Sequence, residues 1–372
     1  MVVVGGSILV IDEGWVQTIY VARALERAGF RVTVCSANGG TAQYRRRSVT
    51  WQSAPTVASG GLIAHLERAV TDGGFELVVP LTEGVMAALW AAAPRWADRI
   101  FPSTTDEQRA LLADKYVLLE HMAPRGVEIP RQHRLHPTLD LDAVADELGL
   151  PLVVKGATGS AGERVRIVES RAELAGACSI ARAEGGPWSV QEYVPGPTFL
   201  VGGLFVDGRA LRVYAAEKLA QHPPRTGPAI RVRSVHDTAL LAVALRVFHE
   251  LRWTGIASAD FIRRPDGRFV LLEVNPRPWG SIASAASAGV DLFTPFGELL
   301  AGRSPPAALE FTADNECLIF PRYLLAPAYR SGRGLVQLVR DLRSDQGAEW
   351  REPGFALHLV QRLYRMQLLR RV

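Results

Sequence analysis

Two polar residues interrupt one of the most apolar runs of the chain. The run LLEVNPRPWG, residues 271–280, carries Glu273 and Asn275 two positions apart and then breaks at two prolines. Side chains alternate across a β-strand, so these two residues share one face of a strand. Their neighbours are apolar on both faces, which predicts a buried strand that carries an acid and an amide on one side.

The sequence before this run predicts a partner strand with another acid. An Asp-Gly pair at 266–267 separates two β-rich runs, which is a strong short-range hairpin signal. If these two residues form the loop, Pro265 pairs with Arg268. Counting outward from that pair places Asp260 directly opposite Glu273.

This predicted hairpin offers ligands for a hard cation. Two buried carboxylates that face each other repel, and one must take a proton unless a cation lies between them. Mg²⁺ prefers carboxylate and amide oxygens and usually also holds substrate phosphates. Asp260, Glu273 and Asn275 are therefore the candidate ligands for Mg²⁺ or Mn²⁺. From the residues alone, a register one residue off and a protonated pair with a structural hydrogen bond remain open.

A glycine-rich segment between two predicted strands is the second candidate site. The segment KGATGSAGER, residues 155–164, can bring its backbone N–H groups close to a phosphate. Lys155 can place an ammonium group on the same phosphates. A strand follows instead of a helix, and the Gly-Lys-Ser/Thr ending of a P-loop is missing. Taken by itself, this loop could also be a flexible strand connector.

The hydrophobic pattern predicts two kinds of sheet. SILVID and RVTVCS flank an amphipathic helix, and this β-α-β unit implies a parallel sheet. A further strand and helix follow, with Thr82 as the N-cap. Downstream, strands, the glycine-rich loop and amphipathic helices alternate in a compact α+β pattern.

The totals are those of an ordinary globular protein. At 372 residues the chain has room for two or three domains. Its net charge is +4, but it has no basic stripe interleaved with aromatic residues, so we expect no nucleic-acid partner. The three cysteines lack metal-ligand spacing, and neither a signal peptide nor a run of membrane-spanning length occurs. We therefore expect a cytoplasmic protein without membrane association.

The order of these motifs resembles the ATP-grasp superfamily. The segments DK (114–115), VVKGATGSAG, VQEYVPG, AEK, SADF and LEVNPRPWGS follow one another within residues 8–300. They are most similar to carboxylate–amine ligases related to carbamoyl-phosphate synthetase and D-alanine–D-alanine ligase. The resemblance implies an α/β and α+β protein, with an N-terminal doubly wound parallel-sheet (pre-ATP-grasp) domain and a two-lobed ATP-grasp fold with antiparallel sheets.

The resemblance also implies domain boundaries and a role for each matching residue. Lys115 and Lys155 would contact the ATP phosphates, and Lys218 matches a further phosphate- or adenine-side lysine. Arg277 and Lys155 would be catalytic, because the Arg277 fork suits both the γ-phosphate and the reacting carboxylate. The implied domains are 1–112 (N-terminal), 113–190 (small lobe with the glycine-rich loop), 191–310 (catalytic lobe) and 311–372 (a helical, basic extension). The implied nucleotide contacts also include Gly156, Thr158, Gly159, Ser160 and Gly162 in the loop, and Gln191, Glu192, Tyr193 and Val194 in an adenine-reading linker.

One position departs from the family pattern. Many relatives have a glutamate shortly after the linker that binds the ribose hydroxyls, whereas this chain has Thr198. Either the nearby Glu192 takes over that role or the ribose is held more weakly.

The implied activity is ATP-dependent amide formation between a small-molecule carboxylate and an amine, through an acyl phosphate, with release of ADP and phosphate. The alternatives are a bicarbonate-using carboxylase or carbamoyl-phosphate-type enzyme, a protein-modifying ligase, and an ATP-binding sensor without turnover. The candidates to bind the amine are Asp12, Glu13 and Glu83; those to bind a carboxylate are Arg225, Arg231 and Arg233. The arginine-rich tail could dock on the body, form a homodimer contact or lie on an anionic membrane.

Overall fold

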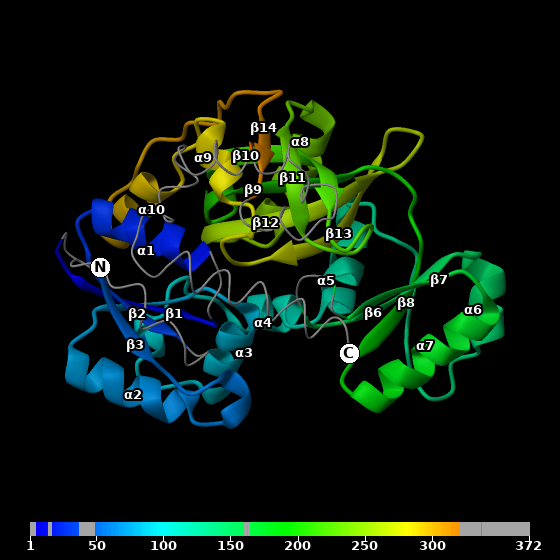
Figure 1. The fold of residues 1–372 in the computed structure, drawn as a ribbon, viewed down its shortest axis with the longest axis horizontal. Helices are drawn as coiled ribbons and strands as arrows, with labels where there is room; N and C mark the ends of the chain where they lie inside the picture. Colours follow the sequence, from blue (N-terminus) through cyan, green and yellow to red (C-terminus); the bar gives the residue numbers. More distant parts are fainter. Residues whose placement is uncertain are drawn as a thin grey trace.

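The computed structural model describes residues 5–13, 17–36, 49–159, 162, 164–319 and 336 of the chain. Three sheets form its framework: a four-stranded parallel sheet, a four-stranded antiparallel sheet and a six-stranded antiparallel sheet. Figure 1 shows the parallel sheet at the lower left, the small antiparallel sheet at the right and the six-stranded sheet above. The predicted combination of a parallel N-terminal sheet with antiparallel sheets downstream is confirmed.

The N-terminal domain alternates strands and helices. Its elements are β1 (Ser7–Asp12), α1 (Gln17–Arg27), β2 (Arg31–Ser36), β3 (Val49–Ser53), η1 (Val57–Ser59), α2 (Leu62–Gly73), β4 (Leu77–Pro80), α3 (Glu83–Ala92) and η2 (Ala97–Arg99). All pairs in the sheet, ordered β3-β2-β1-β4, are parallel. Ile8 and Val10 of β1 enter the core that contains α1, whereas Leu9 and Ile11 enter the core of α2 and α3. Helices therefore cover both faces, as the doubly wound prediction requires.

The small lobe presents one face of its sheet to a helical layer and the other to the pocket described below. Its elements are α4 (Asp106–Leu112), α5 (Lys115–Met122), η3 (Ala123–Arg125), β5 (Gln132–Arg134), α6 (Leu141–Leu148), β6 (Leu152–Gly156), β7 (Val165–Val168), α7 (Arg171–Glu184) and β8 (Trp188–Glu192). Leu152 and Val154 of β6 pack in the core with α6 and α7. Val153 and Lys155 alternate with them and therefore face the pocket.

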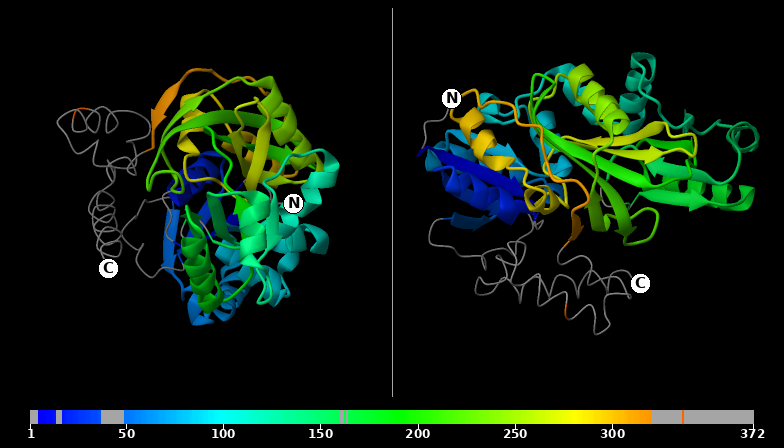
Figure 2. Two further views of the ribbon diagram at one scale, coloured as in Figure 1. Left: turned by 90° about the vertical axis from the view of Figure 1, so that its right-hand side faces the viewer. Right: turned by 90° about the horizontal axis from the view of Figure 1, so that it is seen from above.

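The large lobe is built on the six-stranded sheet, ordered β13-β12-β9-β10-β11-β14. Its elements are β9 (Thr198–Val206), β10 (Arg209–Gln221), β11 (Ala229–Ser234), α8 (Thr238–Glu250), β12 (Gly255–Arg263), β13 (Phe269–Asn275), α9 (Ala283–Ser287), α10 (Phe293–Leu300) and β14 (Glu316–Leu318). Helix α8 lies across one face of this sheet (Figure 2). Helix α10 packs on α1, where a Cβ on Gly297 would lie 2.6 Å from Ala28 Cβ, so one continuous core joins the large lobe to the N-terminal domain.

The β12–β13 hairpin corrects one prediction and confirms another. Its loop has three residues, because Arg264 N–H donates to Arg268 O at 2.8 Å, and Gly267 has a positive φ of 91°. The predicted two-residue loop is therefore wrong. A β-bulge at Leu272 restores the shifted register, so Asp260 still pairs with Glu273.

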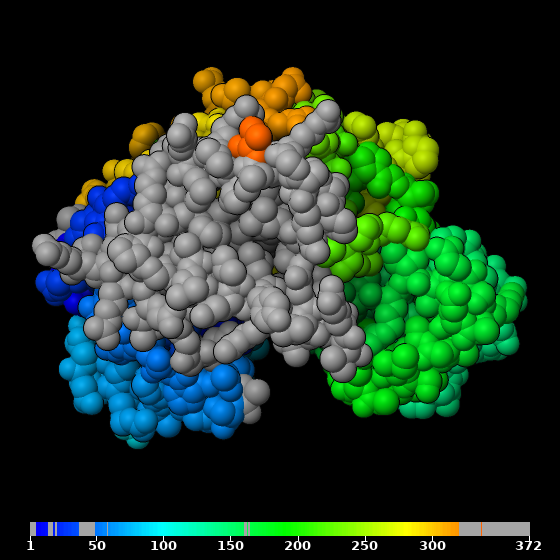
Figure 3. Space-filling view, viewed as in Figure 1, coloured from blue at the N-terminus to red at the C-terminus, as the bar shows by residue number. Residues whose placement is uncertain are grey.

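The N-terminal domain and the small lobe are separated at the edge of the molecule. Figure 3 shows a notch at the lower edge of this face, between the N-terminal domain in blue and the small lobe in green. No helix in the described part of the chain has the length and apolarity to cross a membrane. Of the predicted extension, 311–372, the structure describes only residues 311–319 and 336, and the rest lies outside the described residues. Ser160 of the glycine-rich loop also lies outside them.

Candidate active site

A pocket of about 790 Å³ lies where the N-terminal domain and the two lobes meet. Its walls come from the start of α3, the start of α5, the glycine-rich loop, the segment after β8, the β10–β11 loop and the β12–β13 hairpin. Within the described chain, it brings together every residue implied by the ATP-grasp resemblance: Lys115, Lys155, Gly156, Thr158, Gly159, Gly162, Gln191, Glu192, Tyr193, Val194, Lys218, Asp260, Glu273, Asn275 and Arg277. Segments that are far apart in the sequence thus form one site.

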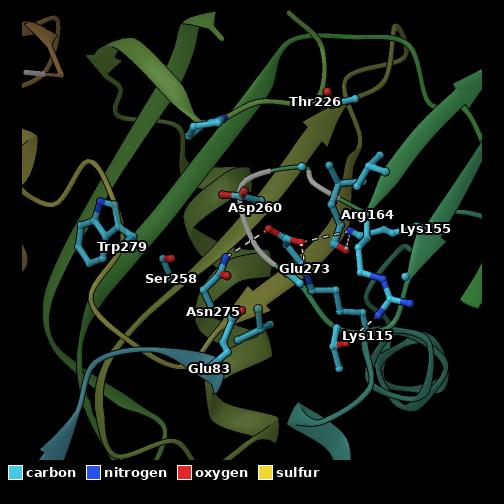
Figure 4. A pocket seen from close by; sticks show the side chains of 18 of the residues that line it. Glu83, Lys115, Lys155, Arg164, Thr226, Ser258, Asp260, Glu273, Asn275 and Trp279 are labelled. Carbon is cyan, nitrogen blue, oxygen red and sulfur yellow. Dashed lines mark hydrogen bonds and ion pairs between the residues drawn. The ribbon is translucent and has the colours of Figure 1, made fainter. Parts of the chain in front are cut away.

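Three lysines contact the two carboxylates of the hairpin, and Figure 4 labels two of them, Lys115 and Lys155. Lys218 Nζ lies 2.6 Å from Asp260 Oδ2. Lys115 Nζ and Lys155 Nζ lie 3.0 and 3.2 Å from the same oxygen, Glu273 Oε2. Because lysine is a compact point charge on a flexible stem, such ammonium groups can transfer from a carboxylate to a phosphate without a change of fold.

Burial and charge act differently on these groups. Burial alone would raise the pKa of Glu273, but the charges of Lys115 and Lys155 outweigh it and hold that pKa well below the usual range. For Asp260, burial prevails over the attraction of Lys218 and raises the pKa. Burial also lowers the pKa of Lys155, whereas for Lys115 the neighbouring acids Glu273 and Glu83 reverse that effect.

The hairpin provides the donor set of a hard-cation site. Asp260 Oδ1 is buried and has no hydrogen-bond partner among the described residues, so it is available to a ligand. Asn275 Nδ2 donates to Glu273 Oε1 at 3.4 Å, which holds the amide beside the carboxylate. No group of three or more His, Cys, Asp or Glu with metal-site geometry occurs in the described ranges. A cation here would therefore use two carboxylates, one amide and oxygens of the substrate, a set that fits Mg²⁺.

The β-bulge has a direct part in this geometry. The extra residue, Leu272, is skipped in the ladder, and its carbonyl accepts a hydrogen bond from Lys155 Nζ at 3.1 Å. The irregularity that preserves the Asp260–Glu273 pair thus also anchors Lys155 over Glu273. The sequence carried no local signal for this bulge.

The glycine-rich loop lies close to two neighbours that leave little room for side chains. Gly162 has a φ of 75°, and a Cβ there would lie 2.1 Å from Thr226 O in the β10–β11 loop. Lys115 Nζ donates to Gly159 O at 2.7 Å. Arg164, which the sequence reasoning missed, stacks on Trp188 at 4.3 Å and donates to Thr158 Oγ1 at 3.1 Å. Its only sequence signal is its place directly after the loop.

The segment after β8 offers backbone groups to a planar ligand. Val194 N–H makes no hydrogen bond in the described part of the chain, so it can donate to a ligand. Gln191 is buried and donates to Gln132 Oε1 at 2.6 Å. The carboxylate of Glu192 is engaged by Arg131 and Arg264, which leaves it poorly placed to replace the missing ribose-binding glutamate. Thr198 does line the pocket.

The candidate substrate-binding residues divide into two groups. Glu13 and Glu83 line the pocket, and Glu83 Oε1 lies 3.2 Å from Arg277 Nη2. Asp12 is instead buried beside Thr18, whose hydroxyl donates to it. Arg225 lines the pocket and stacks on Tyr193 at 4.7 Å. The other two arginines form ion pairs elsewhere, Arg231 with Glu316 and Arg233 with Glu217.

The fold and this arrangement are those of a known class of domain. Residues 112–281 match the family model described as the ATP-grasp domain. The expected resemblance is therefore confirmed for this part of the chain, which carries an ATP-grasp domain.

One sequence relative and two solved structures illustrate the similarity. D-alanine–D-alanine ligase of Anaeromyxobacter sp. (strain Fw109-5) is 33% identical over 161 residues, which are 40% of this chain and 51% of that protein. The match thus spans about half the length of this relative. Biotin carboxylase of Campylobacter jejuni shares the fold with a TM-score of 0.67 at 16% identity, covering 83% of this chain and 74% of that chain. L-amino acid ligase of Bacillus licheniformis gives 0.61 at 19% identity, covering 80% and 74%.

Proposed function

We propose that this protein is an ATP-dependent ligase that joins a carboxylate to an amine as an amide. The observation that carries the proposal is the convergence of Lys155, Arg277 and the Asp260–Glu273 hairpin on one pocket. The 33% identity to a relative named as D-alanine–D-alanine ligase supports carbon–nitrogen bond formation.

ATP would lie along the small lobe. The Val194 N–H, which has no partner among the described residues, would donate to the adenine, and Tyr193 would flank it. Lys115, Lys155 and the N–H groups of the glycine-rich loop would hold the phosphates. Arg164 would keep the loop in place through Thr158 and Trp188.

The metal ligands would be Asp260, Glu273 and Asn275. When bound there, Mg²⁺ or Mn²⁺ would neutralise and orient the phosphate oxygens. The lysines that now contact the two carboxylates would then exchange those partners for phosphate, at little conformational cost.

The proposed reaction has two steps. A carboxylate oxygen attacks the γ-phosphorus in line while the bond to the β–γ bridging oxygen breaks, which gives an acyl phosphate and ADP. The amine nitrogen then attacks the acyl carbon, a proton leaves the nitrogen, and phosphate departs. Lys155 and the Arg277 fork, which line the pocket, would stabilise the charge on the transferring group, and Arg277 would stabilise the oxyanion.

A trapping experiment tests this chemistry before the amine is known. Purified protein, ATP and Mg²⁺ are incubated with pooled carboxylates and hydroxylamine, and both ADP and hydroxamate are measured. We expect hydroxamate from at least one pool, abolished when EDTA removes the metal and restored by added Mg²⁺. ADP without hydroxamate, strictly dependent on bicarbonate, would replace the proposal with carboxylation. ATP binding without turnover in any pool would contradict it in favour of a sensor.

A further inference from the structure

One face of α3 lines the pocket, with the first turn of the helix beside the charged centre. Glu83, Met86, Ala87 and Trp90 are spaced i, i+3, i+4 and i+7, and all four line the pocket. At about 1.5 Å per residue, Ala87 lies about 6 Å and Trp90 about 10 Å along the helix axis from Glu83. The helix starts sharply at the site because the Thr82 side chain accepts from Val85 N–H.

The first turn of this face carries Glu83, which contacts Arg277 of the charged centre (Figure 4). Glu83 Oε1 is buried and makes no hydrogen bond in the described chain, although Arg277 Nη2 lies 3.2 Å away. Glu13 stands beside it, since a Cβ on Gly84 would lie 3.1 Å from Glu13 Oε2. The nearby Lys115 contacts Glu273 instead. The buried Glu83 oxygen thus lacks a hydrogen bond among the described residues, which favours a cationic donor group from a ligand at this end of the helix.

The rest of the face is apolar. Met86 is buried, Ala87 is exposed to the pocket, and Trp90 is partly buried against the main core. Leu112 and Leu118 line the same pocket. An apolar group that leaves water along this face gains about 25 cal/mol for each Å² buried, so side-chain size can determine affinity here.

We infer that α3 is the specificity element of the proposed reaction and selects an α-amino acid with a large apolar side chain as the carboxylate substrate. The substrate carboxylate binds Arg277 and its adjacent ammonium group binds Glu83 and Glu13, so the zwitterion replaces the Arg277–Glu83 contact with two matched ion pairs. The side chain extends along Ala87 and Met86 toward Trp90. This inference depends on the proposed ligase function.

Substrates with and without the amino group test amino-acid recognition separately from ligase activity. Hydroxamate formation is compared for leucine and phenylalanine, in both configurations, for alanine, and for 4-methylpentanoate and 3-phenylpropanoate, which lack only the amino group. We expect kcat/KM to fall about 10- to 100-fold without the ammonium group, as for loss of a charged hydrogen bond. Equal use of the deamino acids would overturn the inference while leaving the ligase proposal intact. Absence of hydroxamate from every carboxylate would defeat the ligase proposal itself.

Two variants on α3 test the side-chain position. Ala87→Leu fills the pocket from an exposed helical position, so it should fold, lower kcat/KM for phenylalanine about tenfold or more, and spare alanine. The control Ala91→Leu adds the same side chain to an exposed position of the same helix outside the pocket and should change neither. Glu83→Gln should reduce the use of leucine but not of 4-methylpentanoate. An unchanged preference in both pocket variants would remove α3 from substrate selection.

Discussion

Acidic and basic side chains form two clusters along the β12–β13 hairpin, and the clusters differ in the basic residue that they use. The central cluster pairs lysines with Asp260 and Glu273 inside the pocket. The loop-end cluster (Glu128, Arg131, Glu192, Arg264 and Arg268) joins the hairpin to the small lobe with arginines. In the loop-end cluster each carboxylate contacts two guanidinium groups, whereas in the central cluster Asp260 Oδ1 stays without a partner among the described residues.

The two clusters therefore have different roles: the central one is a candidate binding site, and the loop-end one is a structural contact between the hairpin and the small lobe. Arginine presents a planar fork that fixes the geometry of a carboxylate, while lysine is a point charge that can change partners. Buried charges with incomplete hydrogen bonding contribute little to stability and are retained for another reason. We therefore expect changes in the central cluster to affect turnover and changes in the loop-end cluster to affect stability.

The largest expected effect is that of Asp260→Asn. The amide keeps the shape of the side chain but removes a metal-binding charge, so turnover should fall at least about 100-fold. Because an amide oxygen can still accept a hydrogen bond from Lys218, the fold should be retained, with a melting temperature equal to or below that of the wild type. Hydroxamate formation and thermal unfolding measure the two quantities.

Asp266→Asn is the matched control, since Asp266 lies exposed at the tip of the same hairpin. It should leave turnover at the wild-type level. Full turnover in Asp260→Asn, or equal losses in both variants, would contradict the division between the two clusters.

Arg277→Lys should have the next largest effect, with turnover reduced about 10- to 100-fold despite the conserved charge. Nη2 alone reaches Glu83 Oε1 at 3.2 Å and Asn275 Oδ1 at 3.3 Å, so the guanidinium has further N–H groups for the substrate, whereas lysine would have to make every contact from one nitrogen. Arg268→Lys in the loop-end cluster makes the same change at an exposed position and should leave turnover unaltered. Comparable rates for the two variants would place Arg277 outside the reaction.

The sequence was most informative where chemistry depends on local spacing. Strand alternation placed Glu273 and Asn275 on one face, and the hairpin count placed Asp260 opposite Glu273, where the structure has it. The hairpin loop is one residue longer than predicted, and the register survives only because Leu272 bulges. A bulge depends on packing against other segments, here on Glu128, whose carbonyl accepts from Leu271 N–H at 2.8 Å, and local sequence does not record that.

Contacts between distant segments could not be predicted in the same way. The approach of Glu83 to Arg277 joins the N-terminal domain to the large lobe, and no spacing rule links the two residues. Glu192 was one candidate to replace the missing ribose-binding glutamate, but its carboxylate bonds to Arg131 and Arg264. A motif gives the position of a residue along the chain, whereas the partner of its side chain depends on tertiary packing.

The smallest expected effect is that of Glu192→Gln, which tests the loop-end cluster through the pH dependence of stability. Burial alone would raise the pKa of Glu192, but hydrogen bonds from Arg264 and Arg131 outweigh it and hold the pKa below the ordinary 4.5. A lowered pKa of an acid means that its ionised form stabilises the fold above pH 4.5 and that this stabilisation is lost as the pH falls through the folded value. Glu192→Gln should therefore cost about 1–3 kcal/mol of unfolding free energy at neutral pH and flatten the acid side of the stability curve. The control, Asp207→Asn, removes an exposed ion pair with Arg252 and should change neither the unfolding free energy nor the acid side of the stability curve. Equal stability curves for the two variants would show that the loop-end cluster is no more than a surface contact.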